Sequence, residues 1–264
     1  MDIVGYIASV CIGLILGLLG GGGSILSIPI LVYLFRIDVM LASAYSWFIV
    51  GITSLTGAIS KHKEHLVDTR AGILFGIPSV ITIFSTRKWL VHVIPDTIFQ
   101  LDTFIFSKRL LLLGLFAVLM ILASISMIRG RQETGTETDR SRPVLLMIQG
   151  SLIGFLTGLV GAGGGFLIIP ALVLLTGLSF KTAVGTSLFI IAINSLSGFL
   201  GDVLNYPMDW PFLLTITGMA VLGILIGNAI SHRLSPAHLR KAFGWFVLVM
   251  GCYILFQEIL KNGS

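Results

Sequence analysis

Long apolar stretches follow one another along almost the whole chain and constrain its fold more than any other feature. They fall at residues 3–19, 24–35, 39–60, 71–86, 110–128, 144–160, 166–176, 182–201, 211–230 and 242–260. A helix needs about 20 apolar residues to cross a bilayer, with about 17 as the low end. Charged residues make up only 11% of the chain, whereas soluble domains carry roughly 25%. The pattern therefore predicts an all-α, polytopic integral membrane protein whose outer solvent is the lipid bilayer.

Two of these stretches, 24–35 and 166–176, are too short to cross a membrane alone, and each follows a glycine cluster. The clusters read GLLGGGGS and GLVGAGGG. Each glycine costs about 1 kcal/mol inside a helix, so we expect glycine-broken or re-entrant helices. The segments that restart at Ser24 and Gly165 would offer free N–H groups and a positive dipole end to an anion. Tight helix packing of the small-xxx-small kind is the alternative.

The two clusters belong to a longer internal repeat. When the first half is shifted by 141 positions, glycine, serine and proline residues coincide without a gap for more than seventy residues. We predict two homologous repeats, at 1–128 and 143–264, joined by a polar linker loop at 129–142. We favour inverted repeats, and parallel repeats are the alternative. The coinciding pairs include Gly20 and Gly161, Ser46 and Ser187, Ser54 and Ser195, Asp68 and Asp209, and Pro95 and Pro236.

The distribution of basic residues supports the inverted arrangement. If the halves are inverted, three basic loops share one side of the membrane, and the loop at 202–211, which has no basic residue, lies opposite. Four further basic residues, Arg87, Lys88, Lys108 and Arg109, do not fit this scheme. The last two belong to an insertion of about ten residues after Pro95, which we expect to lie at the interface as an amphipathic piece. The three loops carry Lys61, Lys63 and Arg70; Arg129, Arg131, Arg140 and Arg142; and Arg233, Arg240 and Lys241.

A polar stripe follows each glycine cluster. Ser187, Asn194 and Ser195 lie seven or eight positions apart and share one helical face. Their hydroxyl and amide donors suit an oxyanion, although Ser and Thr often bond back to their own helix instead. Asn194 must find a partner in the middle of a span. The twelve carboxylates and five histidines all lie outside the middle of the spans, so no buried proton relay is expected.

Several classes of protein are disfavoured. The glycine clusters lack the Lys-Ser/Thr of a phosphate loop, no HExxH occurs, and no Ser-His-Asp set can be assembled at membrane depth. We expect no enzyme, no cofactor, no metal site and no nucleic-acid partner. Cys11 and Cys252 are expected to be small buried hydrophobes without a disulfide.

The motifs GLLGGGGSILSIP and GLVGAGGGFLIIP, with the later segment KTAVGTSLFIIAINSLSGFLGD, resemble the TauE/SafE family of sulfite and organosulfonate exporters. The resemblance covers nearly the whole chain and is most specific from Gly158 to Asp202. It implies a multi-pass permease of the plasma (inner) membrane for sulfur oxyanions such as sulfite, sulfoacetate or thiosulfate. The insertion after Pro95 departs from the family pattern.

These observations predict a transporter, and more specifically an exporter, of a small sulfur-containing oxyanion that binds between the two glycine breaks. The alternatives are a carrier of another solute such as a metal ion, a thiosulfate importer, and a non-transporting membrane assembly or anchor protein. The oligomeric state stays open, with a homo-oligomer as one alternative. The predicted substrate-binding residues are Gly20, Gly21, Gly22, Gly23, Ser24, Ser46, Ser54, Gly161, Gly163, Gly164, Gly165, Thr186, Ser187, Asn194 and Ser195.

Overall fold

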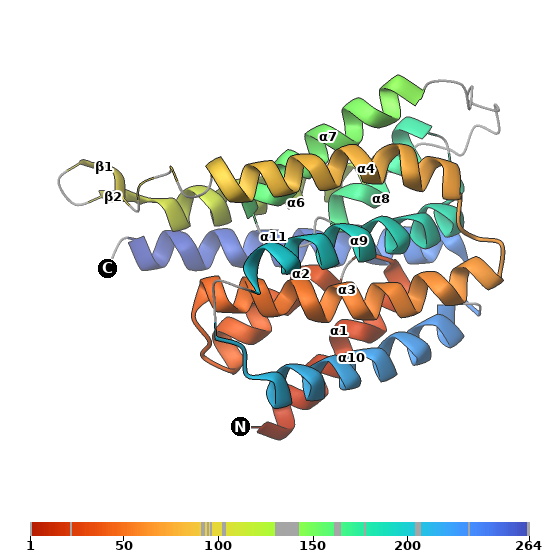
Figure 1. Cartoon of the computed structure of the whole chain (residues 1–264), viewed down its shortest axis with the longest axis horizontal. Coiled ribbons are helices and arrows are strands. Elements are labelled where there is room, and N and C mark those ends of the chain that lie inside the picture. Colours follow the sequence, from red (N-terminus) through yellow and green to blue (C-terminus); the bar gives the residue numbers. More distant parts are fainter. Residues whose placement is uncertain are drawn as a thin grey trace.

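The chain folds into a bundle of apolar helices with one short β-hairpin at its edge (Figure 1). A computed structural model describes residues 2–21, 23–90, 93, 95, 97–101, 104–129, 143–160, 165–176, 178–203, 207–231 and 233–262. The first half contains α1 (Asp2–Leu19), α2 (Gly23–Pro29), η1 (Ile30–Leu34), α3 (Val39–Lys63), α4 (Thr69–Ser85), η2 (Thr86–Leu90), β1 (Thr97–Leu101), β2 (Phe104–Ser107) and α6 (Lys108–Arg129). The second half contains α7 (Pro143–Val160), α8 (Gly165–Thr176), α9 (Phe180–Asp202), α10 (Trp210–Ser231) and α11 (Pro236–Asn262).

Helix length and composition agree with a protein that crosses the membrane several times. In the described part of the chain, five helices are long and apolar enough to span a bilayer. They lie within α3, α4 with η2, α9, α10 and α11. Shorter apolar helices lie within α1, α6 and α7. The predicted all-α membrane fold is therefore confirmed.

The two short apolar stretches form short helices, as predicted. The first is α2 of seven residues, followed by the five-residue π-helix η1, and the second is α8 of twelve residues. Each contains a proline, Pro29 or Pro170. Proline removes a backbone N–H, and the helix changes to π-type directly after Pro29. Neither segment reaches the length of a full span.

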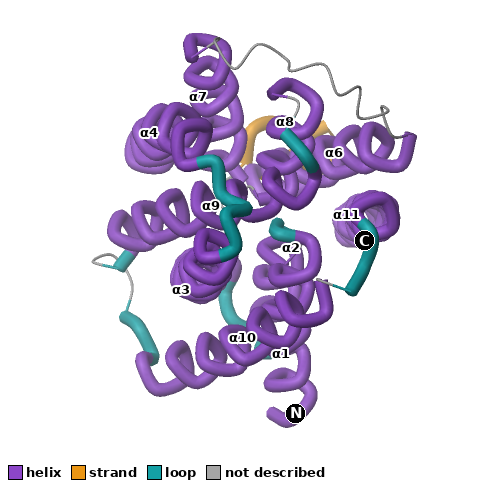
Figure 2. Tube along the Cα trace, turned by 90° about the vertical axis from the view of Figure 1, so that its right-hand side faces the viewer, coloured by secondary structure: helices purple, strands orange, loops and turns teal. Residues whose placement is uncertain are grey.

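The two halves pack on each other and not as separate bodies. The paired helices α3 and α9 lie at the centre, with α4 and α7 on one side of them and α1 and α10 on the other (Figure 2). A fourth pair, α6 and α11, lies along a further side. Every one of these four pairs joins a helix of the first half to a helix of the second. The two halves consequently share one core.

Glycines set the close approach within two of these pairs. A Cβ atom added at Gly13 of α1 would lie 1.7 Å from the carbonyl oxygen of Ala220 in α10. A Cβ atom added at Gly150 of α7 would lie 2.2 Å from the carbonyl oxygen of Phe75 in α4. Small residues let membrane helices approach until their backbones touch, which strengthens van der Waals packing where no hydrophobic effect drives association. Without these glycines neither pair could pack as closely.

Helices that correspond under the 141-residue shift, α3 with α9 and α4 with α10, run in opposite directions. In Figure 1, α3 ends at the right of the view, where the chain turns into α4, whereas α9 ends at the left, where α10 begins. The same view shows α4 running from right to left and α10 from left to right. The connections from α3 to α4 and from α10 to α11 therefore lie at the same end of the bundle. These two connections carry basic residues that the sequence analysis placed on one side.

Two local features differ from expectation. The insertion after Pro95 forms an antiparallel hairpin in which Leu101 pairs with Phe104, a structure that apolar periodicity did not indicate. Cys11 and Cys252 are free thiols on exposed helix faces and are not buried. The prediction of burial was wrong because an apolar helix in a membrane can turn a cysteine outward without the cost that water would impose.

Candidate functional site

The first glycine break begins where α1 ends. Gly20 has φ +73°, and its N–H donates to the carbonyl oxygen of Leu16 at 2.7 Å. A glycine in the left-handed region commonly ends a helix because it has no Cβ to clash. The chain then folds back, so that a Cβ atom at Gly23 would lie 2.2 Å from the carbonyl oxygen of Ile12. Gly20 thus ends α1, and α2 packs back against α1 from Gly23 onward.

The two broken helices meet at this break. A Cβ atom added at Gly21 would lie 2.4 Å from the carbonyl oxygen of Gly165, the first residue of α8. The reverse contact, from a Cβ at Gly165 to the Cα of Gly21, would be 3.0 Å. Segments that are far apart in the sequence are therefore in backbone contact. Gly22, Gly161, Gly163 and Gly164 lie outside the described residues, as does the side chain of Ser24.

Three predicted polar residues keep hydrogen-bonding capacity inside the bundle. Ser54 on α3 and Ser195 on α9 are fully buried, and their hydroxyls have no partner among the described residues. Asn194, also fully buried, donates from Nδ2 to the Oγ of Ser79 at 2.8 Å, while its Oδ1 has no described partner. Buried polar groups are normally paired, because each unpaired one costs free energy. These atoms are therefore candidates for contact with a ligand.

Two other predicted residues, Ser46 and Ser187, use their hydroxyls within the protein. Ser46 shares a hydrogen bond with Ser27 of α2. Ser187 donates to the carbonyl oxygen of Val184 at 2.8 Å and lies 3.3 Å from that of Gly20, so it ties α9 to the first break. These hydroxyls hold the broken helices in place.

The Thr186 hydroxyl has a counterpart in the other half of the chain. The Thr186 hydroxyl accepts from the N–H of Asp68, which caps α4. The Tyr45 hydroxyl accepts from the N–H of Asp209 at 2.8 Å, directly before α10. Tyr45 and Thr186 coincide under the 141-residue shift, as do Asp68 and Asp209. Both hydroxyls fix the start of a helix, in corresponding places.

The two alternatives, hydroxyls that bond back to their own helix and glycines that serve tight packing, apply to other residues near the predicted site. Thr53 and Thr56 bond back to the carbonyl oxygens of Ile49 and Ile52, at 2.6 and 3.0 Å. Gly17 serves packing, because a Cβ atom there would lie 2.6 Å from the carbonyl oxygen of Ile224. The first glycine cluster therefore has two roles: Gly17 packs α1 on α10, and Gly20 ends α1 at the turn.

The sequence analysis did not identify Ser27 and Ser79 as partners of the predicted site. Ser27 lies within the quoted motif GGGGSILSIP, and Ser79 follows Pro78 in α4. Each is fully buried and faces a predicted residue of a different helix. A serine one or two positions from a proline within an apolar run was the available signal.

Comparison with known proteins identifies what the chain resembles. The family model described as "Sulfite exporter TauE/SafE" matches residues 6–254. A probable membrane transporter protein of Xylella fastidiosa is 29% identical over 94% of this chain and 92% of its own length. The probable membrane transporter protein YunE of Bacillus subtilis is 25% identical over 97% and 99% of the two chains. A probable membrane transporter protein of Methanocaldococcus jannaschii is 28% identical over 96% and 93%. No solved structure matches the chain.

Proposed function

The chain belongs to the sulfite exporter TauE/SafE family, and from that premise we propose that it exports a small sulfur-containing oxyanion such as sulfite or an organosulfonate. Membership makes it a multi-pass transporter of the plasma membrane with a small solute as its substrate. The proposal adds the charge and chemical class of that solute, the outward direction and transport without catalysis. Uptake of thiosulfate is the second candidate function. It reverses the direction of transport, but it needs a similar oxyanion-binding site.

The observation that carries the proposal is the set of unpaired donors deep in the bundle. Ser54 and Ser195 lie on the two central helices, about two turns or more from either helix end. A hydroxyl in an apolar interior without a partner costs roughly 1–3 kcal/mol. We infer that these hydroxyls donate to substrate oxygens, because binding would supply the hydrogen bonds that the described protein atoms do not.

The amide of Asn194 adds a further donor to the same site. An amide nitrogen has two N–H groups, and Ser79 takes one of them. The second N–H is able to reach a substrate oxygen. A site made of neutral donors binds an oxyanion without trapping it as a lysine would, and a transporter must also release its substrate. The backbone N–H groups of Gly21, Gly23, Ser24 and Gly165 would complete this cage at the meeting point of the breaks.

The membrane potential could drive export. A potential of about 100 mV, negative inside, favours outward movement of each negative charge by about 2.3 kcal/mol. Sulfite efflux from proteoliposomes should therefore accelerate when the interior is made negative with a potassium gradient and valinomycin. Flux that ignores the imposed potential would contradict this mechanism.

Alanine substitution of the unpaired serines tests the site itself. Ser54→Ala and Ser195→Ala should each raise the KM for sulfite about tenfold, the equivalent of one lost hydrogen bond of about 1.4 kcal/mol. The melting temperature should stay unchanged or rise, because each substitution removes an unpaired buried hydroxyl. Thr53→Val is the matched control, since the Thr53 hydroxyl is already bonded to its own helix.

The same measurements separate transport from a purely structural role. A non-transporting anchor protein would leave sulfite tolerance of cells unchanged in Asn194→Ala and Ser187→Ala variants that still reach the membrane. Unchanged KM values in both serine variants, with sulfite flux intact, would move the binding site elsewhere.

A further inference from the structure

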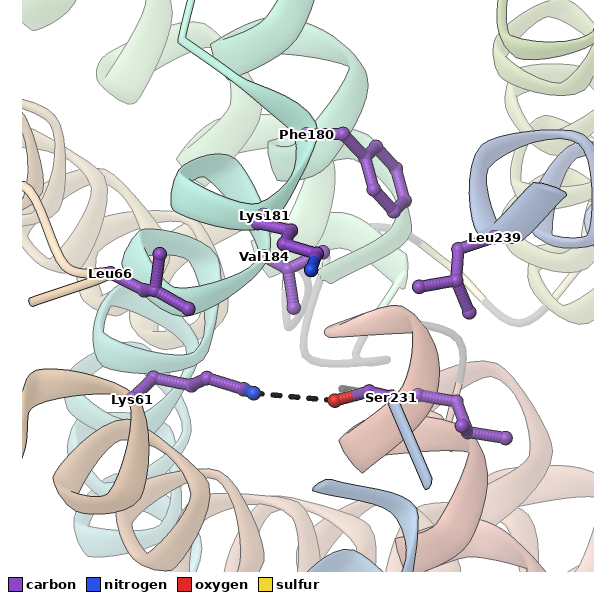
Figure 3. A pocket seen from close by; sticks show the side chains of 8 residues that line it. Lys61, Leu66, Phe180, Lys181, Val184, Ser231 and Leu239 are labelled. Carbon is purple, nitrogen blue, oxygen red and sulfur yellow. Dashed lines mark hydrogen bonds between the residues drawn. The ribbon is translucent and has the colours of Figure 1, made fainter. Parts of the chain in front are cut away.

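A cavity opens at the end of the bundle where α3 and α10 finish and α9 begins (Figure 3). Its empty space, open mouth included, is about 320 Å³. Its lining comes from five segments of both halves: α1, α3 with the loop after it, α9, α10 and α11. The connections at this end carry basic residues, so the positive-inside rule assigns it to the cytoplasm. The cavity therefore lies where an exported anion would enter.

Lys61 is buried in the wall of this cavity. A lysine in the last turn of a helix usually extends into water, as the exposed neighbours His62 and Lys63 do. Lys61 is only 4% exposed. Its Nζ lies 3.1 Å from the Oε2 of Glu64 and 3.3 Å from the Oγ of Ser231 on α10. A buried ammonium group is costly unless it is paired, and Glu64 and Ser231 pair this one.

Lys181 supplies a second ammonium group from the opposite wall. Figure 3 shows its side chain pointing into the space above the Lys61–Ser231 hydrogen bond. It belongs to the first turn of α9, so the positive end of that helix adds to its charge. Two of the described lining residues are lysines and none is acidic. Lys61 is paired with Glu64, so the remaining positive charge of the cavity comes from Lys181, and this charge favours an anion.

The backbone of α9 approaches Lys61 closely. A Cβ atom added at Gly185 would lie 2.2 Å from the carbonyl oxygen of Leu66 and 3.2 Å from the Cβ of Lys61. Only glycine permits this approach of α9 to the end of α3. The close packing at Gly185 thus fixes Lys61 near the N-terminus of α9.

The cavity also adjoins the first glycine break. Val184 lines the cavity, and a Cβ atom at Gly20 would lie 2.7 Å from its Cγ1. Ser187, one turn further along α9, contacts the carbonyl oxygen of Gly20. One side chain thus separates the cavity from the break. An anion that moved inward past Val184 would arrive at the proposed binding site.

We propose that this cavity is a loading vestibule, in which Lys61 and Lys181 bind the anionic substrate before it moves to the glycine breaks. The proposal rests on the proposed export of an oxyanion and adds a second site to it. Glu64, half-buried beside Lys61, acts as a resident counter-ion that an arriving anion displaces. Each anion bound at Lys61 therefore competes with this carboxylate.

Because Lys61 and Glu64 form an ion pair, substitutions of the two residues should change the KM in opposite directions. Purified full-length protein is reconstituted in uncharged phosphatidylcholine vesicles, and initial rates of sulfite efflux are measured at a fixed membrane potential. Lys61→Gln and Lys181→Gln should raise the KM about three- to tenfold with a smaller change in kcat. Glu64→Gln should lower the KM, because it frees Lys61. Lys63→Gln is the matched control, because it removes one charge from the same helix end outside the cavity.

Three outcomes would overturn the vestibule. They are equal effects of Lys181→Gln and Lys63→Gln, a raised KM in Glu64→Gln, and unchanged KM values in both cavity variants while wild-type flux is normal. Lys181 is partly exposed, so its variant keeps the test valid if Lys61→Gln fails to fold.

A binding measurement keeps this inference separate from the proposed function. If the wild-type protein moves no sulfite, the export proposal fails, and the vestibule is judged by thermal stabilisation of detergent-solubilised protein with sulfite. Stabilisation that is lost in Lys181→Gln supports the vestibule. The same lysines could instead hold a lipid phosphate. Stabilisation by phosphatidylglycerol, but not by sulfite, that depends on Lys181 would assign the cavity to a lipid and overturn the proposal.

Discussion

At Gly21 and Gly165, a single methyl group determines whether the two breaks can touch. The backbone at Gly21 has no positive φ, so conformation alone would accept alanine there. The obstacle is space, because the added Cβ would lie 2.4 Å from the carbonyl oxygen of Gly165. Main-chain atoms cannot move aside as a side chain can, so the two broken helices would have to separate.

Gly21→Ala should therefore destabilise the protein by about 1–3 kcal/mol, the usual cost of overpacking, and lower the melting temperature in detergent. Gly218→Ala is the matched control, because it lies in α10 with nothing within 4 Å of the added Cβ. That variant should be neutral or more stable by up to about 1 kcal/mol. Equal melting temperatures for the two variants would mean that the breaks do not touch.

Residue identity predicted which polar side chains lie in the interior, but it did not predict which residues they bond to. Ser54, Ser195 and Asn194 were singled out from type and spacing, and all three are fully buried. Their role in binding stays a prediction. The bond from Asn194 to Ser79 was not predictable, because it depends on how α4 and α9 rotate against each other. Lys61 was read only as a loop charge, since nothing in the sequence shows that Gly185 draws α9 over it.

Among the elements, α4 and α9 share the interhelical hydrogen bond from Asn194 to Ser79, and its contribution can be measured on its own. A cycle of Ser79→Ala, Asn194→Ala and the double variant should give a coupling of about 0.6 kcal/mol, and at most about 1.7. The free energies come from unfolding in mixed detergent micelles. Ser79→Ala combined with Thr217→Val on α10 is the control pair and should be additive. A coupling of zero between Ser79 and Asn194 would show that the bond contributes nothing.

The apolar runs predicted the lengths of the elements, but they predicted less well whether an element is a helix or a strand. The breaks before α2 and α8 were predictable because glycine in a row is incompatible with a stable helix. The hairpin of β1 and β2 was not, because aromatic and apolar residues within the insertion fit a helix or a strand equally over so short a run.

At the scale of the whole molecule, the helix pairs link the halves more strongly than each half is linked within itself. The inverted repeat stays a prediction, and the opposite directions of α3 and α9 and of α4 and α10 support it. The division at 129–142 likewise stays a prediction. Because α1 packs on α10 and α4 packs on α7, the packing faces of each half are buried by helices of the other half.

A chain cut within residues 129–142 tests this dependence. The two fragments, when co-expressed, should co-purify and regain a cooperative melting transition. Each fragment alone should aggregate or be degraded, since its close-packing glycines would have no partner. A monodisperse, cooperatively melting first fragment would show instead that the halves are independent domains.

The pairing of α1 with α10 has a consequence for how the protein is made. Ribosomes add about 5–20 residues each second, so α1, which ends at Leu19, precedes the end of α10 at Ser231 by roughly ten to forty seconds. During that interval the glycine face of α1 has no permanent partner in the bilayer. The nascent first helix must wait at the insertion machinery or in lipid until most of the chain has been translated. Synthesis of this transporter therefore passes through a long stage in which a chaperone or insertase could control its yield.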